Sequence, residues 1–127
     1  MMCPCGSDLN YKDCCEIAHN NIMDVKTAEA LMRSRYSAFV LANGNYLMES
    51  HYKTTRPVKE KKAIVNWAKS VNWISLEVLK TTNGKATDTS GTVEFKAVYQ
   101  EWGKLEVIHE NSKFIKENGC WFYVSAV

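Results

Sequence analysis

The spacing of apolar residues changes part-way along the chain. Between residues 27 and 70, apolar side chains recur every three or four positions, as on one face of an α-helix. From Trp73 onward they alternate with polar residues, which is the period of a half-buried β-strand. The sequence therefore predicts helices followed by an antiparallel sheet, which is an α+β fold with the helices packed on one sheet face.

The first predicted helix begins after Thr27, a favourable N-cap residue, and runs to about Ala42, where Asn43 and Gly44 end the pattern. Its apolar stripe consists of Ala28, Leu31, Met32, Phe39 and Ala42. Arg35 falls within this stripe, so one position of the buried face is charged. A buried arginine needs a polar partner, so Arg35 is a candidate for forming an ion pair or binding an anion.

Two further helices are predicted before the sheet. Asn45 is expected to cap a short helix, and a third helix is expected over residues 59–70, after Pro57 has interrupted the helical pattern. Upstream of all three helices, residues 16–26 are expected to form a polar joint that ends near Thr27.

Four strands are predicted, separated by turns at Asn83-Gly84, Gly103 and Asn118-Gly119. In the first strand, one face is expected to carry Ile74, Leu76 and Val78. In the third strand, Leu105, Val107 and His109 are expected on the face opposite to Ile108, Glu110, Ser112 and Phe114. Cys120, which stands alone in an apolar run, is expected in the core or the sheet.

Composition describes an ordinary globular chain with room for one core domain. The 127 residues are 46% hydrophobic and 24% charged, and the net charge is +2. So small a net charge argues against a nucleic-acid partner. The basic cluster at residues 59–62 fits a solvated helix face better than a phosphate-binding patch. No segment approaches the roughly 20 apolar residues of a membrane span.

Four of the five cysteines lie within the first fifteen residues, at Cys3, Cys5, Cys14 and Cys15. Two closely spaced pairs across a short loop favour a tetrathiolate site, and zinc accepts four thiolates in tetrahedral geometry. Gly6 follows the first pair, where a positive φ would turn backbone N–H groups toward the sulfurs. Four thiolates close the coordination shell, so the expected cofactor is one structural zinc ion.

Two other states of these cysteines, disulfides and free thiols, compete with metal binding. Disulfides require an oxidising compartment, but the start of the chain shows no charged segment followed by the apolar run of a secretory signal. Free exposed thiols would be open to oxidation. Metal binding in the cytoplasm is therefore the preferred prediction.

The cysteine segment and the domain after it resemble two known families. Cys-Pro-Cys-Gly-Ser at residues 3–7 and Tyr-Lys-Asp-Cys-Cys at residues 11–15 resemble the SEC-C motif, the zinc-binding tail of the SecA translocase motor. Signature segments resembling the YchJ family follow in that family's order at residues 31–38, 55–57, 93–99, 109–114 and 121–124.

These resemblances imply two modules. A SEC-C zinc-binding module is expected over residues 1–22. A cone-shaped nuclear transport factor 2-like domain is expected over residues 23–127, with about three helices on a curved antiparallel sheet of about four strands. The YchJ family has no established biochemical activity, so whether the chain is an enzyme stays open.

Cones of this fold leave an apolar pocket in some relatives, and fold alone does not decide its use. The candidate pocket residues are Arg35, Tyr36, His51, Glu94, Tyr99, His109, Glu110, Trp121 and Tyr123. Arg35 has three interpretations: an ion pair with Glu94 or Glu110, a bound anion, or an exposed side chain. His109 and Glu110 are adjacent on a strand and point to opposite faces, so they do not form one acid–base pair. A pairing of His51 or His109 with Glu94 across the pocket stays open.

Three functions compete. The first is an adaptor whose zinc module docks on a protein or ribonucleoprotein partner, because SecA uses the similar module for partner contact. The alternative is a small-molecule binding protein or enzyme, which predicts an apolar cavity that exposes Arg35 and a histidine or carboxylate. The third is a homodimer that pairs through its open sheet face.

Overall fold

The structure is a computed structural model that describes all residues 1–127. The helical elements are η1 (Tyr11–Asp13), α1 (Cys15–Asn20), η2 (Ile22–Asp24), α2 (Ala28–Val40), α3 (Gly44–Glu49), η3 (Val58–Glu60) and α4 (Lys61–Ser70). The strands are β1 (Asn72–Asn83), β2 (Ser90–Glu101), β3 (Lys104–Glu117) and β4 (Cys120–Ala126). They pair antiparallel in the order β1-β2-β3-β4, so the predicted α+β fold is confirmed.

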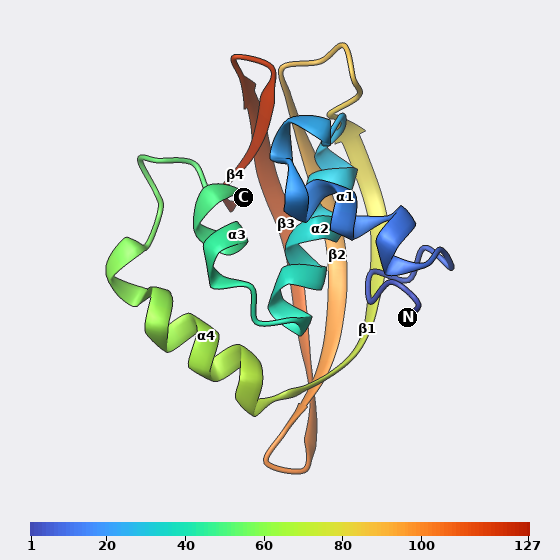
Figure 1. Cartoon of the computed structure of the whole chain (residues 1–127), viewed down its shortest axis with the longest axis vertical. Coiled ribbons are helices and arrows are strands. Elements are labelled where there is room, and N and C mark those ends of the chain that lie inside the picture. The colour runs from blue at the N-terminus through green and yellow to red at the C-terminus, as the bar shows by residue number, and fades with distance from the viewer.

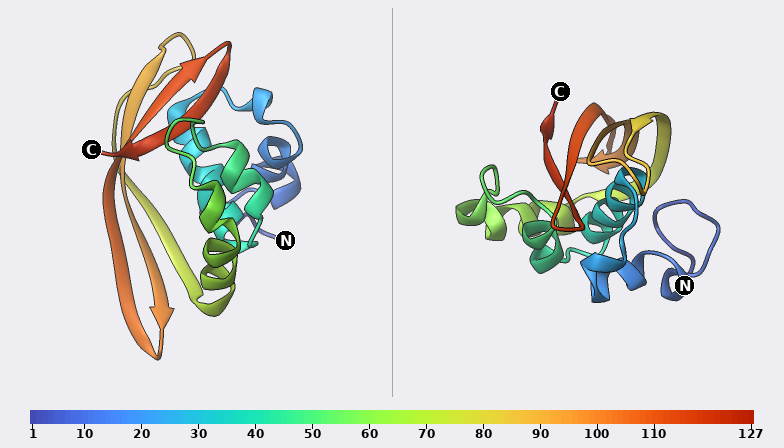
Figure 2. Two further views of the ribbon diagram at one scale, coloured as in Figure 1. Left: turned by 90° about the vertical axis from the view of Figure 1, so that its left-hand side faces the viewer. Right: turned by 90° about the horizontal axis from the view of Figure 1, so that it is seen from above.

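The sheet curves around the helices and leaves one face bare. Helix α2 crosses the inner face, with α3 and α4 on one side and the cysteine segment beside β1 on the other (Figure 1). The β2–β3 hairpin extends beyond the helical layer (Figure 2). No helix has the length and apolar character that crossing a lipid bilayer requires.

Helix α2 begins as predicted, because the Thr27 hydroxyl accepts a hydrogen bond from the Ala30 N–H at 3.0 Å. It ends at Val40, earlier than predicted, and Ala42 takes a left-handed φ of 55°. The predicted cap of the next helix is wrong by two residues. Asn43 rather than Asn45 caps α3, since its side chain accepts from the Tyr46 N–H at 3.1 Å.

The segment predicted as a polar joint, residues 16–26, contains regular structure. Helix α1 and the single turn η2 occupy most of this segment. Helix α1 starts without a side-chain cap, because its N-cap position is Cys14, and so it lacks the usual sequence signal. The turn η2 does have a cap, where Asn21 accepts a hydrogen bond from the Met23 N–H at 3.0 Å.

The predicted alternation in β3 is confirmed, and Cys120 is buried. In β1, however, the prediction for Ile74 is wrong. A register shift between Trp73 and Ser75 breaks the two-residue period there, which leaves the Ile74 side chain 50% exposed.

The core lies between α2 and the sheet. Leu31 of α2 packs with Val93, Phe114 and Trp121 of three strands, all fully or almost fully buried. The start of α2 is fixed by a hydrogen bond from the Ala28 N–H to the carbonyl of Gly84, at 2.9 Å. Gly84 has a φ of +76°, and a Cβ at this position would come within 2.7 Å of the Ala28 side chain. Glycine is therefore required where the β1–β2 turn meets α2.

Candidate functional site

The four N-terminal cysteines form one cluster. Their Sγ atoms all lie within 4.8 Å of one another, and those of Cys5 and Cys14 are 3.7 Å apart. A tetrahedral shell with zinc–sulfur bonds of roughly 2.3 Å places neighbouring sulfurs about 3.8 Å apart. The donor set and its spacing therefore fit a metal ion held by thiolates.

Short-range backbone hydrogen bonds hold the cysteine loop. The Cys3 N–H donates to the Leu9 carbonyl at 2.8 Å, and the Gly6 N–H donates to the Cys3 carbonyl at 3.3 Å. Gly6 has a φ of +82°, so the predicted sharp turn after the first cysteine pair is confirmed. The loop brings Cys3 and Cys5 back toward Cys14, whose Sγ lies 3.2 Å from the Ser7 hydroxyl.

The cluster is attached to helix α2. Arg33 donates from Nη1 to the Cys5 carbonyl at 2.8 Å and from Nε to Glu29 at 2.9 Å. The Ser37 hydroxyl lies 3.6 Å from the Cys3 sulfur. The cysteine cluster thus sits against the domain rather than apart from it.

His19 forms a second link between the cysteine segment and α2. Its Nε2 lies 2.8 Å from the Ser34 carbonyl, which only accepts, so Nε2 carries a proton. Nδ1 lies 2.6 Å from the Tyr11 hydroxyl. Burial lowers the pKa of His19, so the neutral ring with Nδ1 accepting from Tyr11 is the form that fits.

The thiols of the cluster influence one another's protonation. Hydrogen bonding with Cys15 lowers the pKa of the Cys5 thiol, and the same interaction raises the pKa of Cys15. Burial raises the pKa of Cys14. Cys5 therefore ionises before Cys14 and Cys15, and a metal ion would replace the protons that these two hold.

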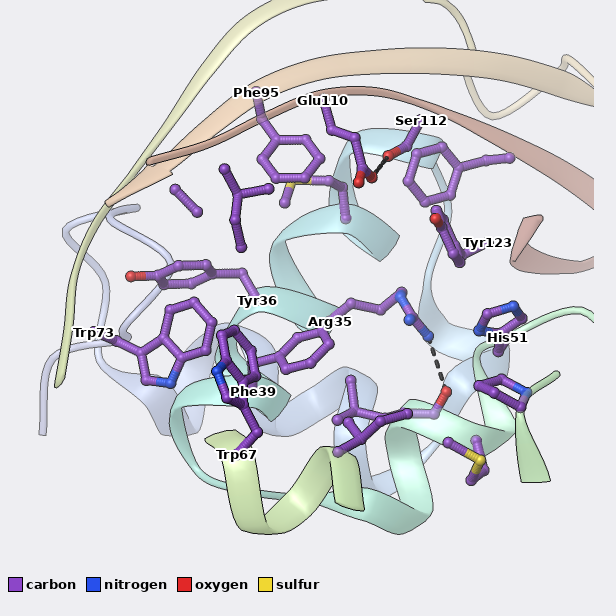
Figure 3. A pocket seen from close by; sticks show the side chains of 18 residues that line it. Arg35, Tyr36, Phe39, His51, Trp67, Trp73, Phe95, Glu110, Ser112 and Tyr123 are labelled. Carbon is purple, nitrogen blue, oxygen red and sulfur yellow. Dashed lines mark hydrogen bonds between the residues drawn. The ribbon is translucent and has the colours of Figure 1, made fainter. Parts of the chain in front are cut away.

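A cavity of about 270 Å³ lies between the helices and the inner face of the sheet. Eighteen residues line it, and 13 of them are hydrophobic. Five of the nine predicted pocket residues are among them: Arg35, Tyr36, His51, Glu110 and Tyr123. Figure 3 shows the guanidinium of Arg35 close to Tyr123 and His51, with the tryptophans at the other end.

The other four predicted residues lie outside this cavity. Trp121 is fully buried in the core, where its indole N–H donates to the Lys26 carbonyl at 3.1 Å. Tyr99 packs on Trp67 and Trp73 beside the cavity without lining it.

Glu94 and His109 occupy the opposite face of the sheet from the pocket. His109 Nε2 lies 2.7 Å from a Glu94 carboxylate oxygen, so this pair forms, but it is exposed. Their strand neighbours Phe95 and Glu110 line the cavity, and alternation turns Glu94 and His109 outward. The pair therefore does not face a ligand in the cone.

Arg35 is held by neutral partners. Its Nη1 donates to the Leu47 carbonyl at 2.9 Å and to the Ser50 hydroxyl at 2.7 Å. It forms no ion pair with Glu94 or Glu110, because the three ion pairs of the chain are Arg33–Glu29, Lys53–Glu117 and His109–Glu94. Neither Nε nor Nη2 has an acceptor in the chain, so the guanidinium retains donors toward the cavity.

The end of the pocket around Arg35 is electropositive. Burial lowers the pKa of Arg35 to about 10, which leaves it charged at neutral pH. Burial, and then the charges of Arg35 and Arg56, lower the pKa of His51 to about 4. His51 is therefore neutral at pH 7 and packs edge-on against Tyr123, with ring centroids 5.0 Å apart.

The opposite end of the pocket is aromatic. The rings of Trp67 and Trp73 meet edge to face with centroids 5.4 Å apart, and Phe39 and Tyr36 each lie 5.8 Å from Trp73. These contacting rings form an aromatic wall of the cavity, on which a flat apolar group can pack.

Sequence reasoning missed Ser112, whose hydroxyl donates to Glu110 at 2.9 Å inside the pocket. Its position two residues from Glu110, on the same strand face, was the available signal. The Leu47 carbonyl that binds Arg35 gave no signal, since any residue supplies a carbonyl.

Comparison with known proteins identifies the class of protein to which this chain belongs. Residues 2–17 match the SEC-C motif, and residues 27–126 match the domain described as YchJ, middle NTF2-like domain. The structure is thus that of a SEC-C motif protein with a nuclear transport factor 2-like domain. The chain belongs to the YchJ family, whose members include the UPF0225 proteins.

Similar proteins occur in distant bacteria. A UPF0225 protein of Vibrio parahaemolyticus is 43% identical over 96% of this chain and 72% of its own length. One from Streptomyces coelicolor is 40% identical over 95% of this chain and 90% of its own length.

Two solved structures share the fold across both modules. The solution structure of a SEC-C motif containing protein from Rhodopseudomonas palustris has a TM-score of 0.88 and 31% identity, and the match covers 100% of this chain and 98% of the other. The crystal structure of a SEC-C motif containing protein from Psychrobacter arcticus has a TM-score of 0.82 and 34% identity, covering 97% and 80%.

Proposed function

We propose that the protein binds a small, largely apolar organic acid in the cone pocket. The observation that carries this proposal is Arg35, whose guanidinium faces an apolar cavity without a carboxylate partner. A buried cation is costly unless it is paired, and a ligand carboxylate is a suitable bidentate acceptor for its remaining donors.

The end of the pocket around Arg35 favours an anionic ligand. Arg56 donates to the His51 carbonyl at 2.9 Å, so it lies close to this end, and the neutral ring of His51 adds no negative charge. The volume of about 270 Å³ corresponds to about nine water molecules at roughly 30 Å³ each, which suits a small metabolite.

Calorimetric titration with 3-phenylpropionate tests the proposal. The carboxylate should bind, its uncharged amide should bind at least tenfold more weakly, and Arg35→Gln should remove this difference. Lys96→Gln is the matched control, because Lys96 is cationic, exposed on β2 and does not line the cavity. Equal affinity for the acid and the amide, or no binding of either, contradicts the proposal.

For the cysteine cluster, the ion that we propose is one structural zinc. Support comes from the four-sulfur donor set, whose Sγ atoms all lie within 4.8 Å of one another, and four thiolates leave no open position for catalysis. Elemental analysis of protein purified from a reducing cytoplasm should give one zinc per chain. A stoichiometric amount of another metal, or none, argues against it.

A second candidate function is the adaptor role, which an apolar surface on the cysteine segment favours. Met1, Met2 and Leu9 are each more than half exposed, and a bridge between Met2 and Asn10 brings their two segments together. Proteins captured by wild type but lost with Leu9→Asp would support the role. Leu105→Asp, at a leucine of the sheet that is also more than half exposed, is the control.

A further inference from the structure

A second charged group faces the same cavity as Arg35. Glu110 extends inward from β3, and it and Arg35 are the only lining side chains that carry a charge at neutral pH, since His51 is neutral there. The two lie at different walls of the pocket, as Figure 3 shows, and form no ion pair within 4.0 Å. Opposite charges in a largely apolar cavity attract each other, so their separation needs an explanation.

Separate tethers keep the two groups apart. Arg35 is fixed by the Leu47 carbonyl and the Ser50 hydroxyl and lies over the ring of Tyr123. Glu110 is fixed by the Ser112 hydroxyl, which donates to Oε2 and leaves Oε1 without a partner in the chain. Each end of the pocket therefore keeps hydrogen-bonding capacity: donors on Arg35 and an acceptor on Glu110.

The free donors of Arg35 and the free acceptor of Glu110 determine which charged groups a ligand needs. A simple anion on Arg35 would fill the cavity and strip water from Glu110 without giving it a cation. A simple amine on Glu110 would do the same to Arg35. A molecule that carries both groups satisfies both residues at once, because burying a charge is costly unless it is paired.

From this geometry we infer that the ligand is a zwitterionic amino acid with an aromatic side chain. This inference rests on the proposed function and specifies its ligand. The carboxylate takes the free Nε and Nη2 donors of Arg35, and the ammonium donates to Glu110. The aromatic side chain packs on the aromatic wall formed by Phe39, Trp67 and Trp73.

Three probes that share one ring separate the contributions of the two charges. L-Phenylalanine carries both groups, 3-phenylpropionate lacks the ammonium, and 2-phenylethylamine lacks the carboxylate. Calorimetry on the full chain should show L-phenylalanine binding at least tenfold more tightly than either of the other two.

Glu110→Gln provides the matching variant, because the amide oxygen of glutamine can still accept the hydrogen bond from the Ser112 hydroxyl. L-Phenylalanine should lose at least tenfold in affinity, while 3-phenylpropionate should bind as well as before or better. Glu94→Gln is the control, since Glu94 lies on the outer face of the same sheet, and it should change neither affinity.

The two proposals fail in different ways. If 3-phenylpropionate binds through Arg35 as tightly as L-phenylalanine, and Glu110→Gln changes neither affinity, the amino-acid inference is overturned while the organic-acid function stands. If neither carboxylate binds, both are overturned.

Discussion

The guanidinium carbon of Arg35 lies 4.7 Å from the centroid of the Tyr123 ring, directly above it. This cation–π contact joins α2 to β4 across the mouth of the cone, where an ion pair to the sheet was one of the expected arrangements. The neutral ring holds the guanidinium in position without using its N–H donors. The remaining donors of Arg35 therefore stay free for a ligand.

Replacing Tyr123 should reveal how much this contact contributes. Tyr123→Leu should lower the free energy of unfolding by about 1–3 kcal/mol, through lost packing and lost cation–π attraction. Tyr123→Phe should cost less than about 0.5 kcal/mol, because the hydroxyl has no hydrogen-bond partner in the chain. Urea denaturation measures both. Equal losses in the two variants would show that the ring is not what matters.

His51 should make stability depend on pH. Its pKa is about 4 in the folded chain and near 6.5 when unfolded, so between these values only the unfolded state takes up a proton. Stability from this residue is therefore full above about pH 6.5 and declines as the pH falls toward 4. Between pH 7 and 5, wild type should lose about 1–2 kcal/mol more than His51→Gln. Parallel pH profiles for the two proteins would contradict this.

Removing one thiolate should disrupt the metal centre. Cys14→Ser should bind well under one metal ion per chain and melt roughly 5–10 °C lower, because metal binding and folding of the segment are linked. Cys120→Ser is the matched control, since Cys120 is buried outside the cluster. It should keep its metal whatever it costs in stability. Full metal content in Cys14→Ser would show that this sulfur is not a ligand.

A substitution at the tip of the β2–β3 hairpin should stabilise the protein. Glu101 pairs with Lys104, so Trp102 and Gly103 form a two-residue turn in which both φ angles are positive, 54° and 77°. Trp102 is 94% exposed and loses no packing when replaced. Trp102→Asn should therefore raise the free energy of unfolding by about 0.5–1 kcal/mol, because asparagine accepts this conformation more readily. Trp102→Ala keeps the strain and should bring no gain; a gain of equal size there would refute the explanation.

Periodicity predicted the fold where local structure followed the period. The alternation of β3 held from Ile108 to Phe114, so the inward direction of Glu110 followed from the sequence. Ile74 was misplaced because the register shift beside Trp73 depends on pairing with a distant strand. Helix α1 was missed because its start has no side-chain cap.

The pocket was predictable only in part. Arg35 was singled out by a charge in an apolar stripe, but its partners are a backbone carbonyl and Ser50, which no pattern marks. Glu94 and His109 were predicted to line the pocket, but the residues next to them in their strands point inward. Strict alternation along a strand places Glu94 and His109 on the outer face of the sheet instead. Which helix covers which part of the sheet depends on tertiary packing that one sequence does not display.

Helix α2 serves both centres with the same few turns. Arg33 and Ser37, four residues apart, face the cysteines, whereas Arg35 and Phe39, also four apart, face the cone. One extra amino acid after Ser34 would rotate everything downstream by about 100° about the helix axis. The Ser37 side chain would then no longer face the cysteine sulfurs, and the Arg35 side chain would no longer face the cavity. Lineages that carry this protein are thus expected to accept substitutions along α2 far more readily than insertions or deletions there.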